Sequence, residues 1–314
     1  MDSLRVFGPV PSRRLGRSLG INNIPPKICS YSCVYCQLGR SLTMVNHRSE
    51  YYDPGELGKE VLDVIQNLLR NNEKIDYLTI VPDGEPTLDQ NLGRLLDILK
   101  TSGIKIAVIT NSTLLDDPGV RKDLSKADLV SMKVDSIDKI TWKKIDRPYG
   151  KIDLENILSG IKAFAGEFSG EILTETMLVK DLNDDPENSQ QTASYLAAIK
   201  PDRSYLSIPT RPPAENWVFP PTAESLNTAF QIFQQAGLNV EYLIGYEGNE
   251  FSFTGNIEQD LLSITSVHPM REDAVEDYLQ RAGGDFEIVE KMLLDGTLEA
   301  SEYQNKRFYL RKLN

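Results

Sequence analysis

Short apolar runs alternate with longer segments of helical periodicity over most of this 314-residue chain. Lys105–Thr110 (KIAVIT) has the length and the β-branched content of a buried strand. Glu56–Arg70 repeats apolar residues every three or four positions, as an amphipathic helix does. Such alternation is typical of βαβ units. We therefore predict an α/β fold with parallel strands, arranged either as an open doubly wound sheet or as a barrel.

About six of these units can be placed along the sequence. The predicted strands are Ser18–Ile24, Asp76–Val81, Lys105–Thr110, Leu129–Val134, Ile172–Val179 and Arg203–Ile208, with Val240–Ile244 as a candidate last strand. The predicted helices are Glu56–Arg70, Leu92–Lys100, Gly119–Lys126, Leu154–Phe168, Glu187–Ile199 and Ala223–Gly237. In either architecture we expect the functional residues at the carboxyl ends of the strands.

The last part of the chain has a different pattern. Three predicted helices precede two predicted strands: Ile257–Ser266, Glu272–Arg281 and Phe286–Leu294, then Thr297–Glu302 and Arg307–Lys312. This order is the pattern of a winged helix, so we predict two domains, 1–248 and 249–314, joined by the turn-rich Glu247–Gly255. From Phe251 to Asn314 there are seven Lys/Arg and twelve Asp/Glu, which argues against a DNA-binding face. We expect a cap, or a surface that grips a peptide or protein.

All three cysteines of the chain lie within eight residues, in the order Cys29, Cys33 and Cys36. A disulfide framework uses an even number of cysteines spread along a chain, so this cluster indicates a metal site instead. Three thiolates on one loop can ligate three irons of a cubane and leave the fourth iron open for chemistry. A closed structural zinc site needs a fourth ligand, which His47 could supply, so the spacing leaves that alternative open.

The spacing C-x3-C-x2-C, with the aromatic Tyr35 directly before the last cysteine, resembles the signature of the radical S-adenosylmethionine (SAM) superfamily. The resemblance covers most of the first 245 residues. It implies a partial (β/α)6 radical SAM barrel with one 4Fe–4S cluster on Cys29, Cys33 and Cys36. It also implies that SAM binds the open iron and is cleaved to a 5′-deoxyadenosyl radical, which abstracts hydrogen from the substrate. Such an oxidoreductase works anaerobically and needs a low-potential electron donor such as ferredoxin or flavodoxin.

Asp83-Gly84-Glu85-Pro86 follows a predicted strand and resembles the family's GGEP element. The ammonium group of SAM needs an acceptor, and the resemblance implies that the carboxylate of Glu85 or a backbone carbonyl there provides it. Gly84 lets the backbone approach closely, because it has no Cβ. Asp83 stands where the family usually has glycine, which is a departure from the pattern. A plain turn with Glu85 as the acid at a helix start is the alternative.

Further positions at predicted strand ends resemble other family elements. Asn111 lies in a segment like the family's TNG. Ser131 and Asp135 fall where the family commonly places residues beside the ribose and carboxylate of SAM. The resemblance implies that these residues, together with Tyr35 and the DGEP segment, bind the cofactor. Lys133 is unusual at its position, and it pairs either with a carboxylate of the cofactor or substrate or with a neighbouring acid.

Two segments, Gly8–Arg17 and Thr210–Glu215, resemble a group of archaeal and bacterial radical SAM proteins related to wyosine-base formation on tRNA. The wyosine-forming enzymes carry a second cluster on additional cysteines, and this chain has no fourth cysteine. We therefore predict a small-molecule or peptide substrate. A tRNA-modifying enzyme and an iron–sulfur or zinc winged-helix regulator are the alternatives. The candidate substrate residues are Arg211 and Tyr205, which lie with Ser207 at the end of a predicted strand, and Arg14 in a basic cluster.

The balance of charges bears on the partners. The chain has 34 Lys and Arg against 46 Asp and Glu, a formal net charge of −12. An acidic surface repels phosphate backbones, so nucleic acid is disfavoured unless Arg13, Arg14 and Arg17 form a basic channel. We find no apolar run long enough to span a membrane and no secretory signal in the first residues. We therefore expect a cytoplasmic protein with no membrane partner.

Overall fold

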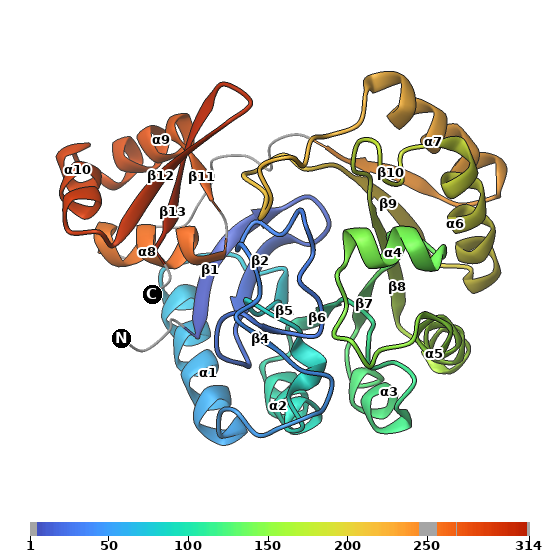
Figure 1. Ribbon diagram of the computed structural model, residues 1–314. Coiled ribbons are helices and arrows are strands. Elements are labelled where there is room, and N and C mark those ends of the chain that lie inside the picture. Colours follow the sequence, from blue (N-terminus) through green and yellow to red (C-terminus); the bar gives the residue numbers. More distant parts are fainter. Residues whose placement is uncertain (1–4, 245–255, 268, 313–314) are drawn as a thin grey trace.

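The computed structural model describes residues 5–244, 256–267 and 269–312, and within them eight strands form one curved sheet (Figure 1). In spatial order these are β1 (Val6–Ser12), β2 (Gly16–Ile21), β5 (Tyr77–Ile80), β6 (Lys105–Thr110), β7 (Leu129–Lys133), β8 (Glu171–Met177), β9 (Arg203–Ser207) and β10 (Val240–Leu243). Every neighbouring pair from β2 to β10 is parallel, and the pair β1–β2 is antiparallel. The sheet curls into an open arc, so the predicted α/β partial barrel is confirmed.

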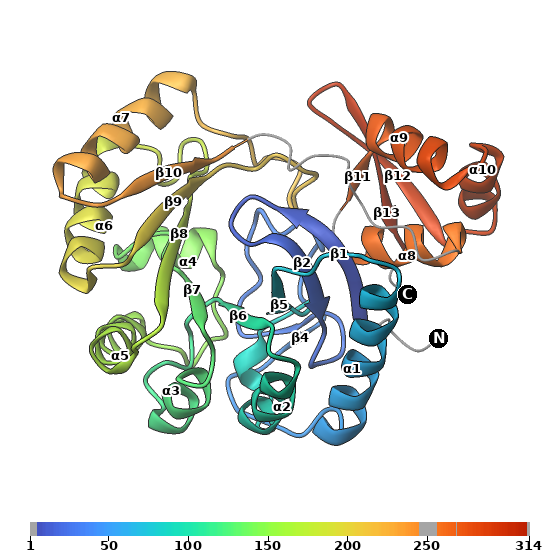
Figure 2. The same cartoon turned by 180° about the vertical axis from the view of Figure 1, so that it is seen from behind.

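Six helices cover the outer, convex face of the arc (Figure 2). They are α1 (Pro54–Arg70), α2 (Leu92–Leu99), α3 (Pro118–Leu124), α5 (Leu154–Glu167), α6 (Pro186–Ile199) and α7 (Ala223–Gln235). In α1, for example, Leu57, Val61 and Ile65 form a buried stripe at helical spacing, and the carboxylate of Asp53 caps the first turn. The sequence predicted all six helices within a few residues of their observed ends.

A seventh helix, α4 (Lys139–Ile145), is one that the sequence did not reveal. In Figure 1 it lies in front of the sheet at β8, and it does not lie with the helices on the outer face. Only Trp142 and Ile145 of its seven residues are buried. Two apolar positions are too few to form the repeat by which an amphipathic helix is recognised in a sequence. Three exposed lysines, Lys139, Lys143 and Lys144, give the helix a basic side.

The sheet also begins with an unpredicted hairpin. The predicted strand Ser18–Ile24 corresponds to β2, and β1 runs antiparallel beside it at the edge of the sheet. β1 contains Pro9 and Pro11, which have no backbone N–H, and proline within an apolar run argues against a strand. An edge strand tolerates these residues because one of its sides has no sheet partner.

The segment between β2 and β5 carries the cysteines. The two-residue strands β3 (Ile28–Cys29) and β4 (Thr43–Met44) pair in parallel and bracket residues 28–44, which we call the cysteine loop. Two 3-10 helices, Pro86–Leu88 and Lys100–Ser102, follow β5 and α2. Backbone hydrogen bonds of Lys27 with Asp83 and of Glu85 with Ile28 place the start of the cysteine loop beside the end of β5.

The inner face of the arc has a small apolar cluster of its own. Leu15, Ala107, Leu129, Leu173 and Tyr205 are buried there, apart from the main core under the outer helices. Successive side chains of a strand point to opposite faces, so residues two positions further along the strands share this inner face. At the next level those residues are Ser131 on β7, Glu175 on β8 and Ser207 on β9. The inner face thus has an apolar layer, which we call the floor of the arc, and above it a polar layer near the carboxyl ends of the strands.

The C-terminal segment contains the predicted three helices and two strands, with one more short strand. Its elements are α8 (Ile257–Val267), β11 (Met270–Arg271), α9 (Glu272–Ala282), α10 (Glu287–Leu294), β12 (Leu298–Tyr303) and β13 (Lys306–Arg311), with the sheet order β11-β13-β12. The segment has a core that includes Leu261 and Tyr278, and Val10 of β1 packs against it. Its assignment as a winged-helix domain at 249–314 stays a prediction. The proposed boundary and the linker Glu247–Gly255 lie outside the described residues.

None of the described helices combines the length and the apolar character needed to cross a membrane.

Candidate active site

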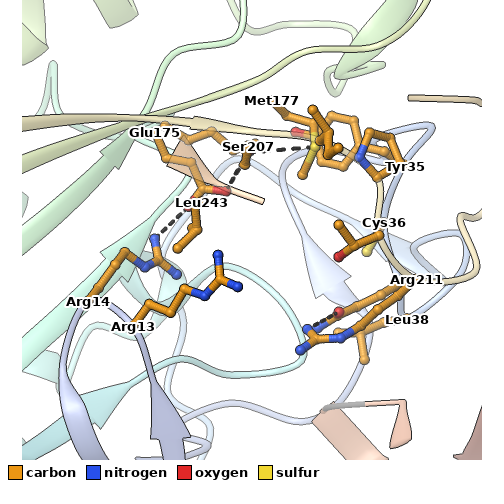
Figure 3. A pocket seen from close by; sticks show the side chains of 15 residues that line it. Arg13, Arg14, Tyr35, Cys36, Leu38, Glu175, Met177, Ser207, Arg211 and Leu243 are labelled. Atoms are coloured by element: carbon orange, nitrogen blue, oxygen red, sulfur yellow. Dashed lines mark hydrogen bonds and ion pairs between the residues drawn. The ribbon is translucent and has the colours of Figure 1, made fainter. Parts of the chain in front are cut away.

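A cavity of about 290 Å³ opens where the parallel strands end (Figure 3). Six parts of the chain line it, from the β1–β2 turn to β10. Arg13 and Arg14 come from the β1–β2 turn, residues 35–38 come from the cysteine loop, and Lys133, Glu175 and Met177 come from β7 and β8. The remaining lining residues are Ser207, Ile208, Pro209, Thr210, Arg211 and Leu243. The predicted site residues Arg14, Tyr35, Cys36, Lys133 and Arg211 therefore face one cavity, although up to 200 positions separate them in the sequence.

Tyr205 does not line this cavity, and its prediction as a substrate residue is corrected. Its ring is buried in the apolar floor of the arc, and its hydroxyl accepts a hydrogen bond from Arg203 at 3.1 Å. Ser207, two residues further along β9, occupies the lining position instead. Two residues correspond to about 6.6 Å along a strand, and the sequence does not reveal at which depth a strand meets the cavity.

The three cysteines lie close enough for their thiols to affect one another electrostatically. The surrounding protein desolvates them, and this effect, reinforced by the charge of Glu85, raises the pKa of Cys29 to about 12. Desolvation also raises the pKa of Cys33 and of Cys36. The free thiols are therefore neutral at pH 7. Iron would have to displace their protons, because the thiolate is the form that ligates a metal.

A single-ion site does not emerge from the same residues. The described part of the chain holds no group of three or more His, Cys, Asp or Glu side chains arranged around one metal ion. His47, the fourth ligand that a structural zinc site would use, is exposed. Each cysteine of a cubane ligates a different iron, so a cluster does not require its three thiols to converge on one point.

Glu85 is a buried residue that joins two loops at the ends of β5 and β6. Its carboxylate accepts hydrogen bonds from the hydroxyl and backbone N–H of Thr87 at 2.6 and 3.0 Å, from the Thr110 hydroxyl at 2.6 Å and from the Asn111 N–H at 2.7 Å. Burial raises the pKa of Glu85, and these four hydrogen bonds oppose the rise. The observed role of the carboxylate is therefore to hold the two loops together.

Gly84 allows the cysteine loop to approach the end of β5. A Cβ added at Gly84 would lie 1.9 Å from the carbonyl oxygen of Ile28, the residue before Cys29. That same carbonyl accepts a hydrogen bond from the Glu85 N–H at 3.1 Å. The close backbone approach that glycine permits here is to the cysteine loop.

Asp83 has a buried carboxylate oxygen with no partner. The residue is 3% exposed, and its Oδ1 atom makes no hydrogen bond within the described residues. Burial raises the pKa of Asp83 to about 7, and the positive charges of Arg311 and Lys27 oppose that rise. Its charge also reaches Cys36, whose pKa it raises. Asp83 therefore offers a buried acceptor whose charge acts on Cys36, a residue that lines the cavity.

Asn111 contacts the cysteine loop directly. Its Nδ2 atom donates to the Ser30 hydroxyl at 2.9 Å and lies 3.5 Å from the sulfur of Cys29. Its Oδ1 atom accepts from the backbone and the hydroxyl of Thr113 at 3.1 and 2.8 Å. These contacts hold the amide in one orientation against the first cysteine.

Charged side chains form a connected network on the inner face. Arg14 lies 2.5 Å from Glu175, and the Lys133 ammonium lies 3.4 Å from Asp135 and 3.8 Å from Glu175. Lys133 also stands 4.7 Å from the centre of the Tyr35 ring. Burial lowers the pKa of Lys133, but Asp135 and Glu175 outweigh that effect and raise it above its ordinary value. Lys133 therefore stays charged and is paired with neighbouring acids.

The same network sets the state of Glu175 and the position of Ser131. Burial raises the pKa of Glu175, but Arg14 and Lys133 outweigh it and lower the pKa to about 2. The Ser207 hydroxyl donates to Glu175 at 3.0 Å. Ser131 is buried, and its hydroxyl lies 3.4 Å from Arg14.

Asp146 is a site residue that the sequence did not indicate. It lies at the end of α4, with its Oδ1 atom 3.4 Å from the sulfur of Cys33 and 3.3 Å from the hydroxyl of Tyr35. Burial, and then the nearby charge of Asp135, hold the pKa of Asp146 well above its usual range. The prediction considered strand ends, and Asp146 follows a helix, so no pattern in the sequence connects it with the cysteines.

The basic residues of the first segment do not share one surface. Arg13 and Arg14 line the cavity, whereas Arg17 donates to Glu73 at 2.5 Å. Arg211, on the far side of the cavity, donates to the side chain of Gln37 in the cysteine loop at 2.8 Å. The channel of Arg13, Arg14 and Arg17 that would favour RNA is therefore not formed.

Comparisons with known proteins agree with this geometry. The model of the radical SAM superfamily matches residues 23–192. The chain is 47% identical over 309 residues to the UPF0026 protein MJ1312 of Methanocaldococcus jannaschii, covering 98% of this chain and 96% of that protein. The fold is similar to that of a radical SAM methyltransferase from Sphaerobacter thermophilus, with a TM-score of 0.54 and 17% identity over 73% of this chain and 67% of that one. The family match spans more than half of the chain and includes the cysteines and the ends of β5 to β8, so this protein is a radical SAM enzyme and belongs to the radical SAM superfamily.

Proposed function

We propose that this enzyme binds one 4Fe–4S cluster on Cys29, Cys33 and Cys36 and uses it with SAM to abstract hydrogen from a small-molecule or peptide substrate. The observation that carries the proposal is the position of the cysteine loop. Its three thiols are close enough to affect one another electrostatically, and Cys36 forms part of the wall of a polar cavity at the carboxyl ends of the strands. When bound, the cluster and SAM supply a one-electron cleavage that generates a carbon-centred radical.

The residues present fit SAM. The unpartnered Oδ1 atom of Asp83 is a buried acceptor beside Cys36, and an ammonium group there would satisfy it. We assign the ammonium to Asp83 and the backbone of the DGEP segment, because four hydrogen bonds already occupy the carboxylate of Glu85. Asn111, Ser131 and Asp135 remain the proposed neighbours of the carboxylate and ribose.

The size and the charged lining of the cavity support a small molecule or a peptide as the substrate. About 290 Å³ is at the lower end of the range for ligand pockets, and SAM bound beside Cys36 would occupy part of this volume, so the remaining space suits a small molecule or one side chain of a peptide. Arg13 and Arg211 line the cavity, and either guanidinium could bind a carboxylate or phosphate of the substrate. The separation of Arg17 from these residues leaves the tRNA alternative with less support.

The test is anaerobic reconstitution with iron and sulfide, followed by dithionite and SAM and an assay for 5′-deoxyadenosine. We expect about four irons per chain and product formation in the wild type. Cys33→Ala should lose both the cluster and the product. Formation of 5′-deoxyadenosine by Cys33→Ala would contradict the proposal. A wild-type protein that binds the cluster and SAM but forms no 5′-deoxyadenosine, even when small-molecule cell extracts are added as a source of substrate, would also contradict it.

A further inference from the structure

The segment around α4 is basic, although the chain as a whole is acidic. Residues 138–153 contain five lysines and arginines against three aspartates, one of which is the buried Asp146, while the chain carries a net charge of −12. The side chains of Lys139, Ile140, Lys143, Lys144 and Lys151 are exposed, and we call this surface the α4 face. It adjoins a hollow of about 510 Å³ that Lys139, Lys143, Arg147 and Lys151 help to line.

Backbone hydrogen bonds attach this segment to the cysteine loop. The N–H groups of Ser32 and Val34 donate to the carbonyls of Asp146 and Ile145 at 3.0 and 2.9 Å, and the Tyr149 N–H donates to Ser30 at 2.9 Å. The buried Trp142 of α4 also donates its indole N–H to the Tyr31 hydroxyl at 2.8 Å. The α4 face is therefore held rigidly against the residues that surround Cys33.

The two halves of the cysteine loop consequently face different parts of the molecule. Residues 35–38 line the cavity, whereas residues 30–34 bond to the α4 segment. The sulfur of Cys33 lies 3.4 Å from Asp146 at the end of α4. A partner on the α4 face would thus reach the cluster ligands from outside, without entering the cavity that the substrate needs.

We propose that the α4 face docks an acidic, low-potential electron-carrier protein, which reduces the cluster by one electron through the side of the loop that bears Cys33. This inference rests on the proposed function, because it requires a cluster on the three cysteines. The carrier loses one electron and the cluster gains it, so no other reactant is needed. Complementary charge selects an acidic protein as the occupant and accelerates its encounter with the enzyme.

The chemistry of the face favours a protein over RNA. Ile140 is 66% exposed among the lysines, and an apolar side chain at the centre of a charged surface is a feature of protein interfaces. An RNA substrate would have to reach the cavity, whereas none of the residues of this surface lines it. The overall charge of −12 also opposes a large polyanion more strongly than a small acidic protein.

The experiment compares two reductants on the reconstituted enzyme. The variant Lys143→Glu/Lys144→Glu reverses two exposed charges of the α4 face, and Lys100→Glu/Lys122→Glu reverses two exposed charges on other helices as the matched control. Cluster reduction is followed by the loss of its visible absorbance, with dithionite or with reduced flavodoxin at low salt. This readout does not depend on SAM or substrate.

We expect the flavodoxin-driven rate to fall about tenfold or more in the α4 variant and to stay within about twofold of the wild type in the control. The dithionite-driven rate should be the same in all three proteins. Added salt should slow the flavodoxin reaction of the wild type, because salt screens exposed charges. The conservative Lys143→Gln/Lys144→Gln variant should show a smaller loss with an unchanged fold.

Equal flavodoxin rates in the wild type and the α4 variant would overturn the docking proposal, and so would an equal loss with both reductants. Loss of tRNA binding in the α4 variant, with an unchanged flavodoxin rate, would overturn it in favour of an RNA surface. A wild-type cluster that flavodoxin reduces but that never cleaves SAM would contradict the proposed function and leave the docking surface supported.

Discussion

At the scale of single residues, Gly84 is where the cysteine loop and the end of β5 come closest. A methyl group at this position would lie 1.9 Å from the Ile28 carbonyl, and the obstructing atom belongs to the backbone. We expect Gly84→Ala to destabilise the protein by about 1–3 kcal/mol, because a tightly packed site must shift to admit a side chain. Its iron content after reconstitution should also fall, since the shift would displace Cys29.

The matched control for this prediction is Gly166→Ala on α5. No atom lies within 4 Å of a Cβ added there, so the change should be neutral or stabilising by up to about 1 kcal/mol. Chemical denaturation of both variants measures the difference. An unchanged denaturant midpoint for Gly84→Ala would contradict the prediction, because it would mean that the cysteine loop can move without a loss of unfolding free energy.

Asp83 is the residue to which we assign the ammonium group of SAM. Asp83→Asn keeps the shape of the side chain but removes the charge that we assign to the ammonium of SAM. We expect SAM affinity to fall about tenfold or more, since a hydrogen bond to a charged group contributes about 1.5–3 kcal/mol. Equilibrium dialysis with labelled SAM measures the change, with the exposed Asp116→Asn as the control. Equal affinities for the wild type and Asp83→Asn would remove Asp83 from the cofactor site.

At the scale of elements, the β1–β2 turn is tied across the arc to β8 by the ion pair of Arg14 with Glu175. The depressed pKa of Glu175, about 2 against an ordinary 4.5, means that the folded state favours the charged form. This contribution is therefore complete above about pH 4.5 and is lost as the pH falls toward 2. The shift corresponds to about 3 kcal/mol.

The variant Glu175→Gln tests this pH dependence. It should be less stable than the wild type at pH 6, because Arg14 and Lys133 lose their buried partner. The difference in unfolding free energy should shrink as the pH is lowered to 3, where Glu175 of the wild type loses part of its advantage. A difference that stays constant from pH 6 to pH 3 would contradict the assigned shift.

At the scale of the whole molecule, the C-terminal segment has its own core but packs on β1 of the barrel. The Tyr303 hydroxyl also donates to the Pro209 carbonyl, beside the cavity, at 3.1 Å. If residues 249–314 form a separate domain, Leu261→Ala should destabilise that domain by about 2–5 kcal/mol. Leu261 is fully buried there.

Thermal unfolding followed by calorimetry should then show the C-terminal transition moving alone. Leu96→Ala, at a fully buried position in the barrel core, should move the other transition. A single transition that shifts with either variant would show that the two parts unfold together, and the predicted two-domain organisation would be wrong.

Much of the barrel was predictable because its strands and helices are marked by local patterns. A buried parallel strand is apolar along its length, and a covering helix has one apolar stripe, so both can be recognised without knowing their neighbours. Two elements that the sequence did not reveal, β1 and α4, lack such marks. β1 is interrupted by Pro9 and Pro11, and α4 buries only Trp142 and Ile145.

The sequence by itself determined the alternation of strands and helices and the short spacing of the three cysteines, because these are properties of residues close together along the chain. Only the tertiary structure decided which side chains meet. Tyr205 lies two residues too deep to reach the cavity, and Glu85 is occupied by its neighbours. Asp146 reaches Cys33 from a distant helix. These three outcomes depend on how the sheet curves and how its loops pack. The depth of a side chain in the barrel, its hydrogen-bond partners and contacts between residues more than 100 positions apart cannot be inferred from a local sequence pattern.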